Sequence, residues 1–271
     1  MLIRIAVTAL DKSPLLRRLL WRWWYQRLAK KFRQQSWTFM NYGYEPEPGA
    51  VALPLDVEHE PDRLCVQLYE QVLAGTELEG KDVVEVGSGR GGGASYLART
   101  QSPRKYVGCD FSKSAVKLCR RSHEGVANLE FVNGDAEDLP FEDASCDVVI
   151  NVESSHCYGD VDAFFSEVAR VLRPAGHFAF ADFRTEAEMK GVAAKLSGLA
   201  GFRVLESVDI TSRVVAALRS DDARKRQLIE EIITPRFRHL FGEFAGLSGG
   251  RMFTSLQERE MVYHRFLLQK C

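Results

Sequence analysis

His156 and Asp182 have side chains that could move a proton. His156 follows shortly after one apolar run that predicts a buried strand, and Asp182 lies at the end of the next. The two runs cover residues 146–152 and 177–183. Carboxyl ends of parallel strands meet at one edge, where open α/β sheets bind their ligands. Histidine exchanges a proton near neutral pH, and an adjacent carboxylate fixes its tautomer and stabilises the imidazolium. We therefore predict that His156 is a general base and that Asp182 orients it.

Both residues also have a structural interpretation. His156 could pack against a substrate without exchanging a proton, and Asp182 could cap a helix at the end of its strand. The sequence contains no group of His, Cys or paired acids at metal-ligand spacing, so we expect no metal site.

A glycine-rich turn, Gly87-Ser88-Gly89-Arg90-Gly91-Gly92, follows an apolar run over 81–86 and precedes a predicted helix over 92–100. Glycines allow a tight turn and let a cofactor approach the main chain. Nicotinamide enzymes share this pattern, and an ordinary strand-to-helix turn is the simpler alternative. Glu85 favours a different cofactor, because its carboxylate would repel a pyrophosphate and attract the ammonium and sulfonium of S-adenosylmethionine.

Acidic residues follow the next two predicted strands. Asp110 follows the run over 105–109 and can accept hydrogen bonds from both ribose hydroxyls, although it could instead cap a helix, a role for which Ser112 competes. Asp135 and Ala136 follow the run over 129–132, where a carboxylate and backbone N–H groups can bind an adenine ring. A polar surface turn is the alternative there. Together with the glycine turn, these residues predict a nucleoside cofactor.

The elements that must position these residues alternate between strand and helix, which predicts an α/β fold with a mostly parallel sheet covered on both faces. Further helices are predicted over 60–74, 113–122, 161–172 and 186–199, and further strands over 202–210 and 261–268. Residues 212–247 predict one or two amphipathic helices broken near Pro235. We expect this insertion, about 212–258, to form a cap over a substrate cleft in a core spanning residues 78–271.

Residues 1–77 predict a helical lid and an entrance to the site. A helix over 14–35 combines apolar residues with arginines, and nine basic residues stand against one acid in residues 1–40. It could pack as a lid on the core or make peripheral membrane contact. The loop over 36–54 supplies the aromatic residues Trp37, Phe39, Tyr42 and Tyr44, which we expect at the entrance.

Composition limits the remaining function classes. The chain has 271 residues and a net charge of -1, so no global charge favours a nucleic-acid partner. Its six cysteines form no C-x-x-C pair, which is typical of reduced thiols in a cytoplasmic protein. No apolar run is long enough to span a bilayer, and the basic residues follow the apolar start, unlike a secretory signal. The oligomeric state stays open.

The segments VVEVGSGRGGG, GCD, GDAEDLPF and VARVLRPAGHF resemble successive motifs of class I S-adenosylmethionine-dependent methyltransferases, over roughly residues 78 to 184. RPAG replaces the RPGG of many members. The resemblance implies a Rossmann-like, seven-stranded, mostly parallel sheet with a reversed final hairpin, and S-adenosylmethionine as cofactor. It also implies a set of cofactor contacts. These are Glu85, Gly87, Ser88, Gly89, Asp110, Phe111, Asp135, Ala136, Glu137 and Asn151.

A narrower resemblance extends over FMNYGYEPEP and VESSHCYGDVDAFFSEVARVLRP. These segments are similar to the mycobacterial phthiotriol and phenolphthiotriol dimycocerosate methyltransferases, which O-methylate a secondary alcohol on a long lipid, and to natural-product O-methyltransferases. The resemblance implies O-methylation of a hydroxyl on a large hydrophobic lipid, polyketide or other secondary metabolite. Alternatives are C-methylation, nicotinamide-dependent oxidation or cofactor binding without catalysis. Expected substrate contacts are Trp37, Tyr42, Tyr44, Ser155 and Tyr158.

Overall fold

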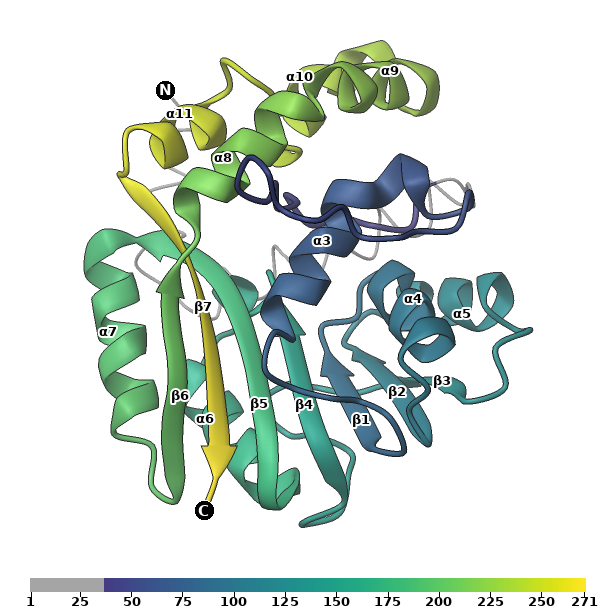
Figure 1. Cartoon of the computed structure of the whole chain (residues 1–271). Helices are drawn as coiled ribbons and strands as arrows, with labels where there is room; N and C mark the ends of the chain where they lie inside the picture. Colours follow the sequence, from purple (N-terminus) through teal and green to yellow (C-terminus); the bar gives the residue numbers. More distant parts are fainter. Residues whose placement is uncertain (1–36) are drawn as a thin grey trace.

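The computed structural model describes residues 37–271 (Figure 1). The helix predicted over 14–35, with its alternative roles as lid and membrane contact, lies outside the described residues. Residues 37–54 form the predicted irregular loop, with a turn near Gly49.

A seven-stranded sheet forms the body of the described chain, in the order β3-β2-β1-β4-β5-β7-β6. The first five strands pair in parallel, and β7 runs antiparallel to both β5 and β6. This arrangement confirms the mostly parallel Rossmann-like sheet and its reversed last hairpin. The strands are β1 (Asp82–Val86), β2 (Lys105–Asp110), β3 (Leu129–Asn133), β4 (Cys146–Val152), β5 (Leu172–Thr185), β6 (Phe202–Asp209) and β7 (Met261–Lys270).

Helices cover both faces of the sheet, and each face has its own apolar core. One core joins the sheet to α3 (Arg63–Val72), α4 (Gly92–Thr100) and α5 (Lys113–Ser122). The other joins it to α6 (Val161–Val171) and α7 (Glu186–Ser197). Strands β1 and β4 are buried almost throughout because both of their faces pack against helices, as their continuous apolar runs predicted.

Side-chain caps fix where α5 and α6 begin, near the carboxyl edge of the sheet. Ser112 accepts a hydrogen bond from the backbone N–H of Ala115 at the start of α5, so it fills the capping role that competed with Asp110. Asp160 caps α6 through the N–H groups of Asp162 and Ala163. These caps hold the loops after β2 and β4 at the carboxyl edge of the sheet.

The insertion between β6 and β7 contains four helices. Three of them lie over 212–247, where one or two were expected, so the predicted number was too low. They are α8 (Thr211–Ser220), α9 (Asp222–Ile232), α10 (Pro235–Phe244) and α11 (Arg251–Gln257). One break falls at Asp221, and another precedes Pro235, where Ile233 and Thr234 are extended as residues before proline tend to be. Gly246 and Gly249 adopt positive φ between α10 and α11. We call α8–α11 the cap.

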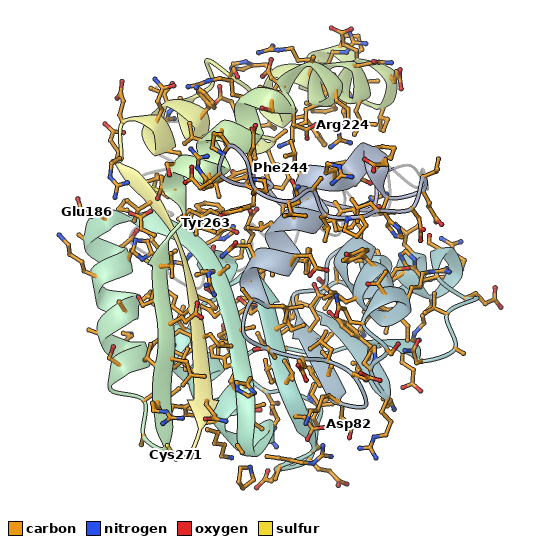
Figure 2. The ribbon with its side chains drawn as sticks, in the orientation of Figure 1. Asp82, Glu186, Arg224, Phe244, Tyr263 and Cys271 are labelled. Atoms are coloured by element: carbon orange, nitrogen blue, oxygen red, sulfur yellow. The ribbon has the colours of Figure 1, made fainter. Side chains whose placement is uncertain are left out.

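The cap lies beyond the carboxyl edge of the parallel strands, whereas Asp82, at the start of β1, lies at the opposite edge (Figures 1 and 2). Helix α3, preceded by a 3-10 turn over Glu60–Asp62, lies between the cap and the sheet. Within residues 37–271, every helix is too short or too polar to cross a membrane.

Candidate active site

The glycine turn borders a cavity at the carboxyl edge of the sheet, which we call the glycine-turn cavity. Gly87, Gly89 and Gly91 all have positive φ, between 55° and 80°. A Cβ at Gly87 would lie 2.3 Å from Ser154 Oγ, so only glycine lets the turn pack against the loop after β4. The cavity is lined by Trp37, Met40, Val86, Gly87, Gly89, Arg90, Cys109, Asp110, Phe111, Ser112, Ala115, Gly134, Asp135, Ala136, Glu137, Glu153, Ser154, Cys157 and Tyr158.

Asp110 lines this cavity at the end of β2. Its two carboxylate oxygens accept hydrogen bonds from the backbone N–H groups of Gly89, at 2.9 Å, and Ser112, at 2.8 Å. Burial raises the pKa of Asp110 to about 6, although these two hydrogen bonds oppose the shift. The carboxylate is thus fixed beside the glycine turn, where it retains lone pairs for the hydroxyls of a sugar.

The segment after β3 forms another wall of the cavity through Asp135, Ala136 and Glu137. Asp135 accepts a hydrogen bond from the backbone N–H of Glu137, at 3.1 Å. Glu137 in turn accepts from the N–H groups of Gly159, at 2.7 Å, and Asp160, at 3.1 Å. The loops after β3 and β4 are therefore tied to each other across the cavity.

Glu85 was expected to face the cofactor, but the structure places its side chain away from the cavity lining. Its carboxylate is buried and accepts hydrogen bonds from the hydroxyls of Tyr69, at 2.7 Å, and Tyr106, at 2.9 Å. Burial raises the pKa of Glu85 to about 7, against the effect of the two tyrosines. The residue alternation of β1 turns this side chain toward α3.

Asn151 and Ser88, also expected to contact the cofactor, lie outside the lining of the glycine-turn cavity. Asn151 is fully buried, and its amide donates to the carbonyl of Val86, at 2.8 Å, and to the hydroxyl of Tyr158, at 2.9 Å. It fixes the loop after β4 rather than reaching the cavity. Ser88 lines a neighbouring cavity instead.

His156 and Asp182 meet as predicted. The imidazole Nδ1 lies 2.8 Å from Asp182 Oδ1, and the backbone N–H of His156 donates to Asp182 Oδ2 at 3.0 Å. The His156 ring packs on Phe183, with 4.4 Å between the ring centroids. The Nδ1 contact to Asp182 and the packing on Phe183 orient the imidazole, and the backbone N–H bond fixes the main chain of His156 to the same carboxylate.

Asp182 is fully buried, and hydrogen-bond donors surround its carboxylate. Its oxygens accept from the hydroxyl of Ser155, at 2.6 Å, and from the N–H of Phe183, at 2.8 Å, and the Arg184 guanidinium lies 3.1 Å away. Burial disfavours the charged carboxylate, but Arg184 and His156 outweigh burial and hold its pKa below the ordinary range. Ser155 was expected to touch the substrate; its buried hydroxyl instead positions Asp182.

The pKa of His156 is shifted in the opposite direction. Burial opposes protonation of the imidazole, but Cys157 and Asp182 outweigh burial and raise the pKa to about 10. In this arrangement His156 therefore holds a proton at neutral pH. Both ring nitrogens are then protonated, and His156 can accept a proton at Nε2 only after the proton already on Nε2 has left.

A second cavity, which we call the histidine cavity, adjoins the first and contains His156. It is lined by Thr38, Phe39, Met40, Asn41, Tyr42, Tyr69, Gly87, Ser88, Gly89, Arg90, Gly92, Gly93, Val152, Glu153, His156, Phe183 and Phe244. The expected substrate residue Tyr42 lies here, stacked on Phe183 at 5.2 Å. Trp37 and Tyr158 line the glycine-turn cavity instead, and Tyr44 packs on the core outside both linings.

Glu153 is a site residue that sequence reasoning missed. It lines both cavities and has a positive φ of 47°, which is uncommon for a residue other than glycine. Its Oε1 accepts from the N–H of Tyr42, at 2.8 Å, and from the hydroxyl of Tyr263, at 3.0 Å. Burial raises its pKa to about 7. Its place directly after β4, three residues before His156, was a signal that could have identified it.

Sequence comparison finds close relatives over nearly the whole chain. A family model described as "Methyltransferase domain" matches residues 84–180. The phthiotriol/phenolphthiotriol dimycocerosates methyltransferase of Mycobacterium tuberculosis is 38% identical over 250 residues, which cover 92% of each chain. The fatty-acid O-methyltransferase of Mycolicibacterium smegmatis is 37% identical over 246 residues, covering 91% of this chain and 88% of that protein.

Solved structures share the fold at lower sequence identity. The [4+2]-cyclase SpnF has a TM-score of 0.65 at 19% identity, covering 92% of this chain and 94% of that one. The geranyl diphosphate C-methyltransferase from Streptomyces coelicolor A3(2), solved with S-adenosyl-L-homocysteine, has a TM-score of 0.61 at 16% identity, covering 91% and 98%. These likenesses establish the fold.

Proposed function

Because this chain belongs to the S-adenosylmethionine-dependent methyltransferases, in the group that includes the phthiotriol/phenolphthiotriol dimycocerosates methyltransferases, we propose that it O-methylates a hydroxyl on a large hydrophobic lipid, polyketide or other secondary metabolite. The observation that carries this proposal is the His156–Asp182 pair, 2.8 Å apart, in the cavity adjoining the glycine turn. Family membership excludes the nicotinamide-dependent oxidoreductase considered above.

The residues of the glycine-turn cavity fit S-adenosylmethionine. Gly89 lines this cavity with a positive φ of 55°, and because it has no side chain a ligand can approach the main chain there. We assign the ribose hydroxyls to Asp110, and the adenine to Asp135 and the backbone around Ala136. The cofactor supplies an activated methyl group on a sulfonium. The residues around it need chiefly to position the acceptor and exclude water.

Glu153 replaces Glu85 as the carboxylate that faces a cationic ligand. Glu85 is enclosed by two tyrosines, whereas Glu153 borders both the glycine-turn cavity and the histidine cavity. A carboxylate there attracts a positive charge more strongly than one in water, since the surroundings are of low polarity. A bound cation in turn favours the ionised form of Glu153.

His156 takes the proton of the acceptor hydroxyl in this proposal. An alcohol is a poor nucleophile at neutral pH, so a base within hydrogen-bond reach accelerates its attack. Nδ1 of His156 donates to Asp182, which leaves Nε2 as the proton acceptor. The imidazolium loses its Nε2 proton more readily when a sulfonium occupies the neighbouring cavity, because a nearby like charge lowers the imidazole pKa.

A second candidate acceptor is the carboxyl group of a fatty acid. The 37% identical relative from Mycolicibacterium smegmatis is named a fatty-acid O-methyltransferase, which favours this alternative. A carboxylate is already ionised at neutral pH and needs no base. The two candidates therefore differ in their dependence on His156.

Methyl transfer from radiolabelled S-adenosylmethionine to a panel of long-chain alcohols and fatty acids tests the proposal. We expect label in a methyl ether, which survives alkaline hydrolysis. Label that alkali releases as methanol would identify a methyl ester and favour the fatty-acid alternative. No transfer to any hydroxyl compound, with transfer to a carboxylic acid, would contradict the proposal.

A further inference from the structure

A third cavity lies between the cap and the loop that enters the site, and we call it the cap cavity. Its wall is mainly apolar and includes Ile229, Ile232 and Phe241 from α9 and α10. It shares Trp37 with the glycine-turn cavity and Phe244 with the histidine cavity. Figure 2 shows Arg224 and Phe244 between the cap helices and the body of the protein. The position suits the alkyl part of an acceptor whose hydroxyl lies beside His156.

One cation on this apolar wall, Lys225, has only long polar contacts among the described residues. Lys225 is only 9% exposed, and its ammonium lies 3.4 Å from the carbonyl of Ala245 and 3.9 Å from Asp221 Oδ2. Asp221 is already paired with Arg224, through hydrogen bonds of 2.6 Å and 2.7 Å to its two oxygens. Lys225 therefore keeps donors that the surrounding residues engage at long distance or not at all.

Burial of such a cation is costly unless it is hydrogen-bonded. Lys225 forms an i,i+4 ion pair with Asp221, but at 3.9 Å this pair is longer than the 2.6 Å and 2.7 Å bonds by which Arg224 engages both oxygens of the same carboxylate. Lys225 Nζ also lies 5.9 Å from the ring of Tyr42, which belongs to the histidine cavity. The ammonium thus lies where the cap cavity and the histidine cavity meet.

The local charge count indicates what kind of group suits Lys225. Two acids, Asp62 and Asp221, balance Arg224 and Lys225 around the polar end of the cap cavity. A carboxylate ligand would add an unbalanced negative charge near Asp221, whereas a neutral hydroxyl or ester oxygen would accept a hydrogen bond without one.

We propose that Lys225 binds a second, neutral oxygen on the acceptor, separated along its alkyl chain from the hydroxyl that is methylated. This inference rests on the proposed function, since it assumes that an alcohol occupies the histidine cavity. Three rings connect the two ends: Tyr42 lies near Lys225 and stacks on Phe183, and Phe183 packs against His156. The enzyme would thereby select diol-like or ester-bearing chains over simple alcohols.

Binding of alcohols to the protein loaded with S-adenosylhomocysteine tests this inference without requiring turnover. The probes are 1-dodecanol and a series of 1,n-alkanediols of eight to twelve carbons, measured by isothermal titration calorimetry. Wild type is expected to bind at least one diol about 10-fold or more tightly than 1-dodecanol, a difference typical of one hydrogen bond to a charged group. Lys225→Met should remove that preference.

Two variants control for packing and folding. Ile232→Met changes the same wall without altering charge and should keep the preference for the diol, and Lys225→Arg should keep part of it. Unchanged affinity for S-adenosylhomocysteine shows that each variant is folded. Equal binding of diols and 1-dodecanol by wild type, no binding of any diol, or a preference that survives in Lys225→Met would each overturn the inference. Methyl transfer to the same alcohols is measured separately. Diol-selective binding without any methyl transfer would count against the proposed function, whereas methyl transfer without diol selectivity would count against the role of Lys225.

Discussion

At the scale of single residues, the proton balance between His156 and Asp182 controls when the imidazole can act as a base. Cys157 and the buried Asp182 carboxylate raise the His156 pKa, and Arg184 and the imidazole lower that of Asp182. A base works only in its unprotonated form, so kcat/KM is expected to rise with pH through the His156 pKa. The pair therefore sets both the orientation of the base and the pH at which it becomes available.

Asp182→Asn should separate these two effects. An amide stabilises the imidazolium less, so the His156 pKa falls and the acidic limb of the kcat/KM profile moves to lower pH. The maximal rate should still drop, by roughly 10- to 1,000-fold, because the amide no longer fixes the tautomer. A pH–rate series measures both. Asp209→Asn, beside His264 on the sheet edge, is the matched control and should leave the profile unchanged. An acidic limb that stays in place would contradict the coupling.

The sequence predicted which segments contribute to the site better than it predicted the direction in which each side chain points. The strand-end rule brought His156 and Asp182 together correctly. It could not show that Glu85 points away from the cavity, because an almost continuously apolar strand gives no alternation from which to assign its two faces. Ser155 and Asn151 were likewise assigned to the correct segment. Their side chains do not reach a cavity but bond Asp182 and the carbonyl of Val86, respectively.

At the scale of elements, the strands and core helices were predictable because most of their apolar runs are bounded by glycine, proline or polar residues. The helical insertion and its break near Pro235 were also predictable, but the number of its helices was not, because the break at Asp221 involves no glycine or proline. The cavity that these helices enclose therefore depends on tertiary packing against residues 37–41 and α3, which the local sequence does not encode.

Phe244 on α10 tests whether the cap contributes to acceptor binding. It lines both the histidine cavity and the cap cavity, so Phe244→Ala should raise KM for a long-chain acceptor roughly 10- to 100-fold through lost apolar contact. The dissociation constant of S-adenosylmethionine should change little. Leu240→Ala on the same helix is the control, because Leu240 is 47% exposed. Equal effects of both variants on KM would exclude a specific role for Phe244.

At the scale of the whole molecule, buried carboxyl groups link the fold to pH. Glu85 joins β1 to α3 and β2 through Tyr69 and Tyr106, and burial raises its pKa to about 7. Because the folded state binds this proton more tightly than the unfolded state, stability from this group is full below the unfolded pKa. It is lost as pH rises toward 7.

Glu85→Gln should remove this part of the pH dependence. The difference in unfolding free energy between wild type and variant should change by about 3 kcal/mol between pH 4.5 and 7.5, with wild type losing stability as pH rises. Urea unfolding followed by circular dichroism across this range measures it. Glu70→Gln, which alters a tyrosine-bonded but partly exposed carboxylate, is the control. A difference that does not vary with pH would contradict the assignment.

The central claim is that His156 removes a proton from an acceptor hydroxyl, and single-turnover methyl transfer by His156→Ala tests it most directly. With enzyme in excess over S-adenosylmethionine and an alcohol that wild type methylates, the rate should fall roughly 10²- to 10⁴-fold. The affinity for S-adenosylhomocysteine should stay within about twofold of wild type, since His156 lies outside the lining of the glycine-turn cavity. A variant that methylates the alcohol at a near-normal rate would contradict the account.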